Sequence, residues 1–283
     1  MAERLAEEKD VLAIVHRRED ARKLTETLDR LLDDQSTFHL SALMCPAHRR
    51  KILAEIKDRK NAGAPVRLVA TQLVEAGVDL DFRVVYRAMA GFDSLAQAAG
   101  RCKLDGLGTM FVFLAETKPP QGILETAFQE ASSMVMQNDR DLFDPDVQRR
   151  FFRRLYGLKD LDKKGLQPDR AALKFEAVAS SYRLIDNDWS ESLVIPYGES
   201  IEIARRLDLP GPLRDTLRKL HAFSVSVTKR DLGAWINSGL VKRHPATSDY
   251  GLAVLAANSD AYDARFGLIP DRVGRFEPDS LIS

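Results

Sequence analysis

The feature that most constrains the fold is an alternation of short apolar runs with amphipathic segments over residues 1–117. Residues 19–32 and 46–60 carry apolar positions at helical spacing, and Pro46 suits the first turn of a helix. Strands that alternate with helices form right-handed βαβ units and a mostly parallel sheet, so we predict a doubly wound α/β domain. The predicted strands are rich in apolar residues and cover 11–15, 36–43, 66–70, 83–89 and 109–115.

Polar side chains and a glycine follow two of these strands. Thr71 comes directly after the strand at 66–70, and Gly77 and Asp79 lie in the connection that follows. Gln97 and Arg101 are four residues apart, which predicts one face of one helix. Ligands of open α/β sheets bind beyond the carboxyl ends of the strands, so the set has the layout of a site.

The residue types in this set suit phosphate chemistry. A hydroxyl and a backbone N–H at Thr71 can hold a phosphate oxygen, and Asp79 can accept a hydrogen bond from a ribose hydroxyl. Gly77 permits close approach of the backbone, and the guanidinium of Arg101 can stabilise charge on a transferring phosphoryl group. Each residue taken singly also has a structural explanation, namely a turn cap, a local ion pair or a surface cation.

These residues lie in two strings that resemble motifs V and VI of superfamily-2 helicases, ATQLVEAGVDLDF and DSLAQAAGRC. The strings VLAIVHRREDARKL and FHLSALMCPAHRRKIL resemble the motif IV region and the strand-helix unit after it, and SYRLIDND, LVIPYGES and YDARFGLIPD resemble an accessory C-terminal domain. Together they are similar to the second half of the type I CRISPR-associated nuclease-helicase, which the Cascade surveillance complex recruits to degrade target DNA.

The resemblance implies a domain organisation. Residues 1–117 are expected to form a RecA-like second helicase lobe of the P-loop NTPase type, with a mostly parallel sheet. Residues 118–283 are expected to form linker helices and a mainly helical accessory domain, and the string KPPQG marks the boundary. The family couples ATP hydrolysis to 3′-to-5′ movement on single-stranded DNA and feeds that strand to a metal-dependent nuclease domain.

The resemblance also implies roles for individual residues. Ser41 and Thr71 are expected on the DNA backbone, Gly77 and Asp79 in nucleotide binding and interlobe coupling, and Gln97 with Arg101 on the γ-phosphate. Local backbone groups that satisfy the Ser41 hydroxyl are an equally open alternative.

A cluster of basic residues follows the second predicted strand. Arg49 and Arg50, with His48 and Lys51 beside them, open the next predicted helix and can reach the same DNA backbone as Ser41. Basic residues at a helix N-terminus oppose its dipole, which favours an anionic partner there. A solvated basic face is the alternative.

Several parts of such an enzyme are missing from the sequence. It contains no G-x-x-x-x-G-K-[ST] loop, no Asp-Glu metal-holding motif and no His-Asp nuclease cluster. ATP and Mg are therefore expected to be shared with a first lobe that this sequence lacks, and the chain alone is expected to be inactive as a hydrolase. Motif VI departs from its usual pattern, since Leu104 occupies the second arginine position and Lys103 lies beside it. This predicts weak hydrolysis even with the first lobe restored.

Composition narrows the class of protein. With 42 basic and 42 acidic residues, the chain is not a DNA-binding protein held by bulk positive charge. No apolar run can span a membrane and no secretory signal is recognisable, so we expect a cytoplasmic protein without a membrane partner. Cys45 and Cys102 lack metal-ligand spacing and are expected to be reduced. The basic string RRFFRRLY is either a strand-tracking surface or, as we favour, an amphipathic helix that buries its apolar residues.

Two other functions stay open at this point. A non-catalytic adaptor, docking on the surveillance complex or on a separate first lobe, fits the missing half and Leu104. A lobe of another superfamily-2 helicase that acts on RNA fits motifs V and VI equally well. The expected partners are thus single-stranded DNA, a first lobe with its nuclease domain, and the surveillance complex.

Overall fold

The computed structural model describes most of the chain, and the parts described are residues 1–32, 34–75, 77–102, 108–137, 141, 143–157, 160, 162–182, 189–209, 213–244, 252–256 and 260–273. The N-terminal part is built on a five-stranded sheet whose strand order is β2-β3-β1-β4-β5, with every pair parallel. The predicted α/β fold is confirmed. The strands are β1 (Asp10–Ile14), β2 (Thr37–Leu40), β3 (Val66–Ala70), β4 (Val84–Ala88) and β5 (Thr109–Phe113).

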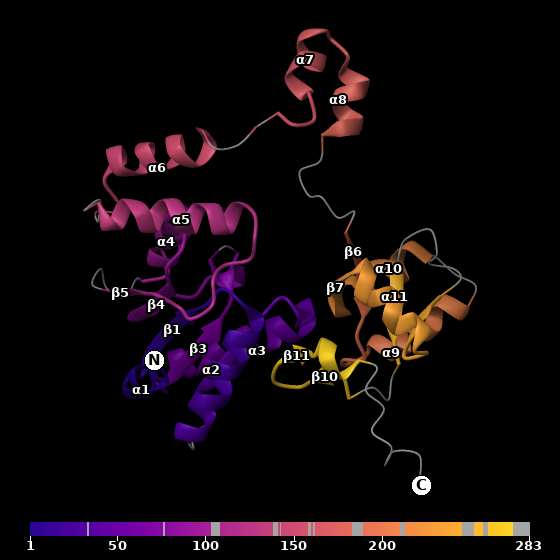
Figure 1. Ribbon diagram of the computed structural model, residues 1–283. Helices are drawn as coiled ribbons and strands as arrows, with labels where there is room; N and C mark the ends of the chain where they lie inside the picture. Colours follow the sequence, from indigo (N-terminus) through magenta and orange to yellow (C-terminus); the bar gives the residue numbers. More distant parts are fainter. Residues whose placement is uncertain are drawn as a thin grey trace.

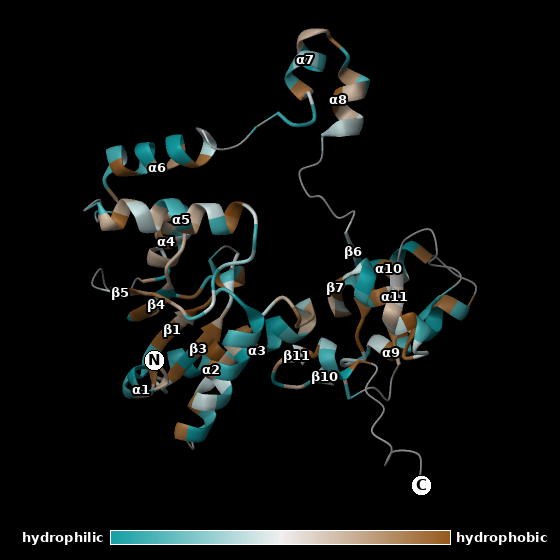
Figure 2. Ribbon diagram, viewed as in Figure 1, coloured by the Kyte–Doolittle hydropathy of each residue, from teal (hydrophilic) through white to brown (hydrophobic). Residues whose placement is uncertain are grey.

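Helices cover both faces of this sheet (Figure 1). On one face, α1 (Ala2–Glu7) and α2 (Arg18–Leu31) bury Leu5, Ala21 and Leu28 against the strands. On the other face, α3 (Pro46–Asn61) contributes Ile56 to a core with apolar residues of β1, β2 and β3. Burial on both faces is the reason why the central strands are continuous apolar runs rather than alternating ones, as Figure 2 shows.

The segment after the sheet is helical. The helices α5 (Ile123–Met136) and α6 (Pro145–Gly157) pack on α4 (Phe92–Ala99) through a third apolar core. Phe151 and Leu155 are buried in that core while Arg153 and Arg154 are exposed, so the amphipathic interpretation of RRFFRRLY is confirmed. By contrast, α7 (Leu166–Ala171) and α8 (Phe175–Ser181) bury none of their residues and stand apart from the sheets in Figure 1.

The remaining part is an α/β unit with a four-stranded mixed sheet of order β7-β6-β9-β8. The residues after 118 are mainly helical, as predicted, and this sheet is their principal strand structure. Its strands are β6 (Ser190–Val194), β7 (Ser224–Thr228), β8 (Val241–Arg243) and β9 (Leu252–Leu255), and its helices are α9 (Ser200–Arg205), α10 (Leu213–Leu220) and α11 (Lys229–Asn237).

A short hairpin joins this unit to the N-terminal lobe of the chain, residues 1–117. Its strands β10 (Tyr262–Asp263) and β11 (Gly267–Leu268) lie beside α3 in Figure 1. The backbone N–H of Leu268 donates to the carbonyl of Leu43 at 2.9 Å, and the N–H of Cys45 donates to the hydroxyl of Tyr262 at 3.1 Å. The hairpin is therefore fixed to the loop that follows β2.

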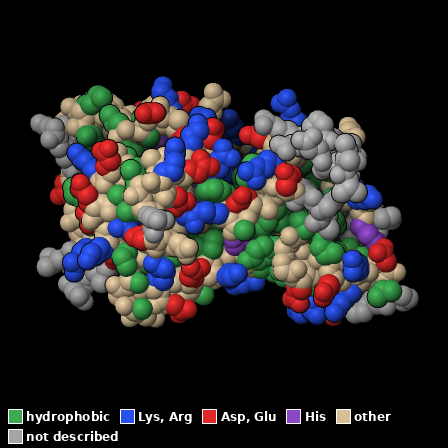
Figure 3. Space-filling model, turned by 90° about the horizontal axis from the view of Figure 1, so that it is seen from below, with side chains coloured by type: hydrophobic (Ala, Val, Ile, Leu, Met, Phe, Trp, Pro, Cys, Tyr) green, Lys and Arg blue, Asp and Glu red, His purple; other side chains and the backbone are tan. Residues whose placement is uncertain are grey.

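Arg265, in the turn of the same hairpin, donates to the Thr37 carbonyl at 2.9 Å and pairs with Asp29. It thus occupies an acceptor on the outer edge of β2, a strand that pairs on its other side with β3. Seen from below, the surface is hollowed between the lobe and the C-terminal unit, and hydrophobic side chains line the hollow (Figure 3).

Two further observations concern single residues and helices. Cys45 and Cys102 are free thiols, as predicted. Within the described part of the chain, no helix combines the length and the apolar character that crossing a membrane requires.

Candidate functional site

The carboxyl ends of three neighbouring strands bring together Ser41, Thr71 and His16. Leu40 pairs with Ala70, and Ala70 pairs with Ile14, so the residues that follow β2, β3 and β1 lie at one edge of the sheet. The Thr71 N–H donates to the Leu40 carbonyl at 3.3 Å, which fixes the start of the loop. The parallel sheet therefore assembles two of the residues predicted to bind DNA.

Ser41 and Thr71 are buried residues whose hydroxyls make no hydrogen bond to another described residue. Ser41 is 1% exposed and Thr71 is 9% exposed. Thr71 precedes the 3₁₀ turn at Gln72–Val74, but its side chain makes no capping bond there. Thr71 thus caps this turn only through its backbone carbonyl, which accepts from the Val74 N–H at 3.4 Å, and its hydroxyl is not used in the cap. Both hydroxyls are thus available to donate to a ligand that enters one of the neighbouring cavities.

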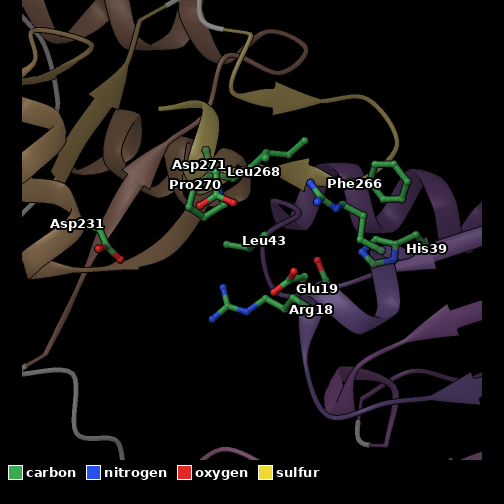
Figure 4. A pocket seen from close by; sticks show the side chains of 12 residues that line it. Arg18, Glu19, His39, Leu43, Asp231, Phe266, Leu268, Pro270 and Asp271 are labelled. Atoms are coloured by element: carbon green, nitrogen blue, oxygen red, sulfur yellow. The ribbon is translucent and has the colours of Figure 1, made fainter. Parts of the chain in front are cut away.

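Three cavities lie along this edge of the sheet. The first, which we call the Ser41 cavity, has a volume of about 310 Å³ and lies between the start of α2 and residues 266–271 (Figure 4). The second, the Thr71 cavity, has a volume of about 480 Å³ and is lined by His16, Arg17, Arg18, Ala42, Thr71, Gln72, Leu73 and Pro120. Arg18 lines both cavities, so the two hydroxyls face a continuous region of the surface.

The third cavity, of about 240 Å³, brings together Arg49, Arg50 and Gly77, with Leu73 shared between it and the Thr71 cavity. Gly77 adopts φ 75°, a conformation that favours glycine. Arg50 is exposed and Arg49 is partly buried. The sequence analysis placed these residues in separate motifs, and the fold makes them neighbours.

His48 does not belong to this basic surface. It is buried, stacks on Tyr197 with ring centroids 4.7 Å apart, and lies 2.9 Å from the Tyr262 hydroxyl through its Nδ1. Burial lowers the pKa of His48. The expectation that His48 reaches the DNA backbone is therefore wrong, because the C-terminal unit covers it.

Asp79 lies in the connection between β3 and β4, which we call the motif V loop, at its exposed end. Its carboxylate is fully exposed, and its nearest cation is the Lys57 ammonium at 3.9 Å. A pair of that length in solvent contributes little to stability. Asp79 is thus free to accept a hydrogen bond from a ligand that enters from outside.

Gln97 and Arg101 do not share a helix face, because α4 ends at Ala99 and Gly100 caps it. Gln97 is exposed near the end of the helix. Arg101 lies in the following turn, where its Nη1 donates to the Val78 carbonyl and its Nη2 donates to the Glu75 carbonyl at 3.1 Å. Arg101 therefore ties the motif V loop to the end of α4. Lys103 and Leu104, the positions where motif VI departs from its usual pattern, lie outside the described residues.

A buried ion pair beneath this loop was missed by the sequence analysis. The Arg87 Nε lies 2.8 Å from a Glu75 carboxylate oxygen, and both side chains are almost fully buried. Burial raises the pKa of Glu75, although Arg87 opposes the shift, and burial likewise lowers the pKa of Arg87. The available signal was an arginine within the apolar run at 83–89, since a buried cation needs an acidic partner.

His16 is the third polar residue at the strand ends. It is 7% exposed, and its Nδ1 has no partner among the described residues. Burial, and then the charge of Arg87, lower the pKa of His16 to about 4. The ring is therefore neutral at pH 7, so the cationic character of the Thr71 cavity comes from Arg17 and Arg18.

The residues present fit a nucleotide only in part. Gln97 and Asp79 are exposed and can contact one, but both terminal nitrogens of Arg101 already donate to backbone carbonyls. Among the described residues, no group of three or more His, Cys, Asp or Glu side chains could hold a metal ion.

Comparison with known proteins finds similarity in the N-terminal part of the chain. The family model for the C-terminal part of the CRISPR-associated nuclease/helicase Cas3 matches residues 7–104. The Cas3 protein of Haloferax volcanii is 48% identical over 54 residues, which cover 19% of this chain and 6% of that protein. The Cas3 protein of Methanothermobacter thermautotrophicus is 28% identical over 94 residues, which cover 33% of this chain and 11% of that protein.

Solved structures extend the likeness of fold to the C-terminal unit. A crystal structure of T. fusca Cas3 with AMPPNP matches 94% of this chain and 39% of its own, with a TM-score of 0.58 and 16% identity. A CRISPR RNA-guided surveillance complex in a pre-nicking state contains a chain that matches 95% of this chain and 42% of its own, with a TM-score of 0.58 and 17% identity.

The chain thus spans well under half the length of the relatives that it matches. The sequence match covers the lobe that carries the strand-end site, and the match of fold covers nearly all of the chain. Residues 7–104 therefore match the C-terminal family model of the CRISPR-associated nuclease/helicase Cas3, and the fold of nearly the whole chain is similar to that of solved Cas3 structures.

Proposed function

We propose that this chain is the second motor lobe and accessory unit of an ATP-dependent translocase that moves on single-stranded DNA and serves in the degradation of foreign DNA. The observation that carries the proposal is the edge of the parallel sheet. Ser41 and Thr71, whose hydroxyls make no hydrogen bond to another described residue, line cavities that also contain arginines. Phosphate contacts of this kind position a protein on a nucleic acid without reading its sequence.

In this proposal, a nucleic-acid strand lies along the carboxyl edge of the sheet. Ser41 and Thr71 donate hydrogen bonds to backbone phosphates, and Arg49 and Arg50 neutralise phosphates further along, next to Gly77. The motif V loop, which Arg101 ties to α4, lies between this edge and the predicted nucleotide-facing residues. A shift of that loop would therefore couple the two regions.

The proposed hydrolysis requires a first lobe, because the sequence contains no phosphate loop. ATP and Mg would bind between the lobes and supply the driving reaction, with Gln97, Asp79 and Gly77 facing the nucleotide. Arg101 can join them only if it releases the Val78 and Glu75 carbonyls. We infer that Arg101 acts first as a positioning residue for the loop.

The test of the motor proposal is ATP hydrolysis with and without a separately produced first lobe from a Cas3 protein of the same organism. The chain alone should not hydrolyse ATP, and the mixture should do so when single-stranded DNA is added. Hydrolysis by the pure chain would contradict the proposal. In the mixture, Leu104→Arg should raise turnover, and an absence of any gain would contradict the role proposed for that position.

Two other functions stay open, namely an adaptor that docks on the surveillance complex and a helicase lobe that acts on RNA. A docking partner is supported by the apolar residues exposed on and beside α7 and α8, such as Leu173 and Phe175. An adaptor would bind the surveillance complex while it leaves ATP hydrolysis unchanged in the mixture with the first lobe. An RNA helicase lobe would bind single-stranded RNA more tightly than DNA of the same sequence.

A further inference from the structure

A buried arginine beneath the motif V loop has a donor that its present contacts do not use. Arg87 lies near the carboxyl end of β4 and is 0% exposed. Its Nε lies 2.8 Å from the Glu75 carboxylate, and its Nη1 donates to the Ala88 carbonyl at 2.9 Å. Its Nη2 is buried and makes no hydrogen bond with any described residue. Because a buried cationic donor without an acceptor is costly, a further acceptor for Nη2 would stabilise this arginine.

An acceptor of that kind lies in the first turn of α4. The Oδ1 of Asp93 is buried and likewise makes no hydrogen bond with any described residue. Burial lowers the pKa of Arg87, and the charges of Glu75 and then of Asp93 oppose that shift, so both carboxylates act on the guanidinium. A donor and an acceptor of opposite charge, both unused, therefore belong to one buried cluster.

This cluster connects the motif V loop to both ends of α4. At the first turn of the helix, Ser94 is buried, and burial raises the pKa of Glu75 while Arg87 and Ser94 oppose the shift. After the end of the helix, the Nη2 of Arg101 donates to the Glu75 carbonyl at 3.1 Å. A displacement of the loop at Glu75 would therefore act on α4 from both ends. Gln97, which is proposed to face the nucleotide, lies on this helix.

A second buried arginine of the same sheet provides a structural comparison. Arg67 lies near the amino end of β3 and is 5% exposed. It donates to the Leu5 carbonyl at 3.2 Å, to the Ala6 carbonyl at 2.9 Å and to the Ser36 hydroxyl, so each of its side-chain nitrogens has an acceptor. Arg67 thus fastens α1 to the sheet with all of its donors in use, whereas Arg87 keeps one donor free at the edge that carries the site.

We propose that Arg87 is a positioning residue that couples the motif V loop to α4, with Glu75 as its partner on the loop and Asp93 as its partner on the helix. This inference rests on the proposed function and adds a coupling element to it. The ion pair with Glu75 holds the loop on β4, and a shift of the loop brings the free Nη2 onto Asp93. Two acceptors for one buried cation provide the two discrete arrangements that coupling between separate sites requires.

The test is amide hydrogen exchange of the whole chain with and without an oligothymidylate. In the wild type, the oligonucleotide should slow exchange in the motif V loop and, through Arg87, in α4, by about five-fold or more. The main variant combines Glu75→Leu with Arg87→Met, because an apolar pair of similar volume replaces a buried ion pair with little loss of stability. It should keep the protection of the loop and lose that of α4. Asp93→Asn, which removes only the charge on the helix, should reduce the protection of α4 in the same way.

Arg67→Met is the matched control, because it removes a buried arginine from the same sheet and leaves the motif V loop untouched. Its α4 should respond as in the wild type. If the loop is protected but α4 does not respond in the wild type, or still responds in the double variant and in Asp93→Asn, this inference is wrong and the proposed function stands. If the oligonucleotide protects neither segment of the wild type, both are overturned. Circular dichroism verifies that each variant is folded, and Asp93→Asn decides if the double variant is not.

Discussion

Replacing Gly267 by alanine should detach the β10–β11 hairpin from the lobe. Gly267 adopts φ 79°, and a Cβ atom there would lie 2.5 Å from the Leu43 carbonyl oxygen and 2.9 Å from the Met44 Cγ. The clash falls on backbone that also accepts the hydrogen bond from Leu268. Because a backbone carbonyl cannot rotate away as a side chain can, the hairpin itself must move.

The expected cost has two parts. A non-glycine residue at positive φ costs about 1–2 kcal/mol, and overpacking against a fixed neighbour costs about 1–3 kcal/mol more. Gly267→Ala should therefore lower the free energy of unfolding by about 2–5 kcal/mol. Gly239 is a matched control, because it adopts φ 79° with no atom within 4 Å of its added Cβ. Gly239→Ala should cost only the first part, about 1–2 kcal/mol.

The assay is urea denaturation followed by circular dichroism and by tryptophan fluorescence, since Trp235 lies in the core of the C-terminal unit. The difference between the free energies of unfolding of the two variants measures the cost of the clash with the loop after β2. Equal free energies of unfolding for Gly267→Ala and Gly239→Ala would refute the argument that the hairpin is tightly fixed to that loop.

Three further predictions concern stability. Glu75→Ala leaves Arg87 buried without its partner and should lower the free energy of unfolding, measured by urea denaturation, by about 3–5 kcal/mol. Glu19→Ala, which removes one partner of an exposed pair, should cost far less, and similar costs for the two variants would contradict the buried pair. Burial, with Arg265 and Arg22 adding to it and Asp263 opposing it, lowers the pKa of His39 to about 4 from its ordinary 6.5. As the pH decreases, His39 is therefore protonated in the unfolded chain before it is protonated in the folded chain. The free energy of unfolding is thus highest above about pH 6.5 and decreases toward pH 4. Urea denaturation at several pH values should show that the free energy of unfolding of His39→Gln decreases less steeply with falling pH than that of the wild type, by at most about 1.4 kcal/mol per pH unit. The same pH dependence in both proteins would refute this prediction. Amides of residues 166–181 should exchange with solvent far faster than those of β1, because α7 and α8 are short and bury nothing; slow exchange there would show a missing contact.

Most of the fold could be predicted from the sequence, because the information is local. The run at 66–70 coincides with β3, and Pro46 begins α3 as its position in the sequence indicated. A strand that is buried on both faces is a continuous apolar run, so its place can be read without knowledge of its neighbours. The choice of Thr71 as a site residue followed from its place directly after such a strand.

The contacts between distant segments could not be predicted. Nothing near His48 in the sequence indicates that Tyr197 and Tyr262 bury it. The end of α4 at Ala99, which turns Arg101 toward the Glu75 and Val78 carbonyls, depends on tertiary hydrogen bonds that helical spacing does not reveal. The cavities that join Ser41, Arg18 and Thr71 likewise exist only after the strands have paired.

The measurement that tests the central claim most directly is single-stranded DNA binding by the whole chain at about 50 mM and about 200 mM salt. It compares the wild type with Thr71→Ala and with the control Thr27→Ala, whose hydroxyl bonds the Lys23 carbonyl on the exposed face of α2. We predict salt-sensitive binding that Thr71→Ala weakens and Thr27→Ala does not. Binding that is equal for the two variants, or absent in the wild type, would contradict a nucleic-acid site at the carboxyl edge of the sheet.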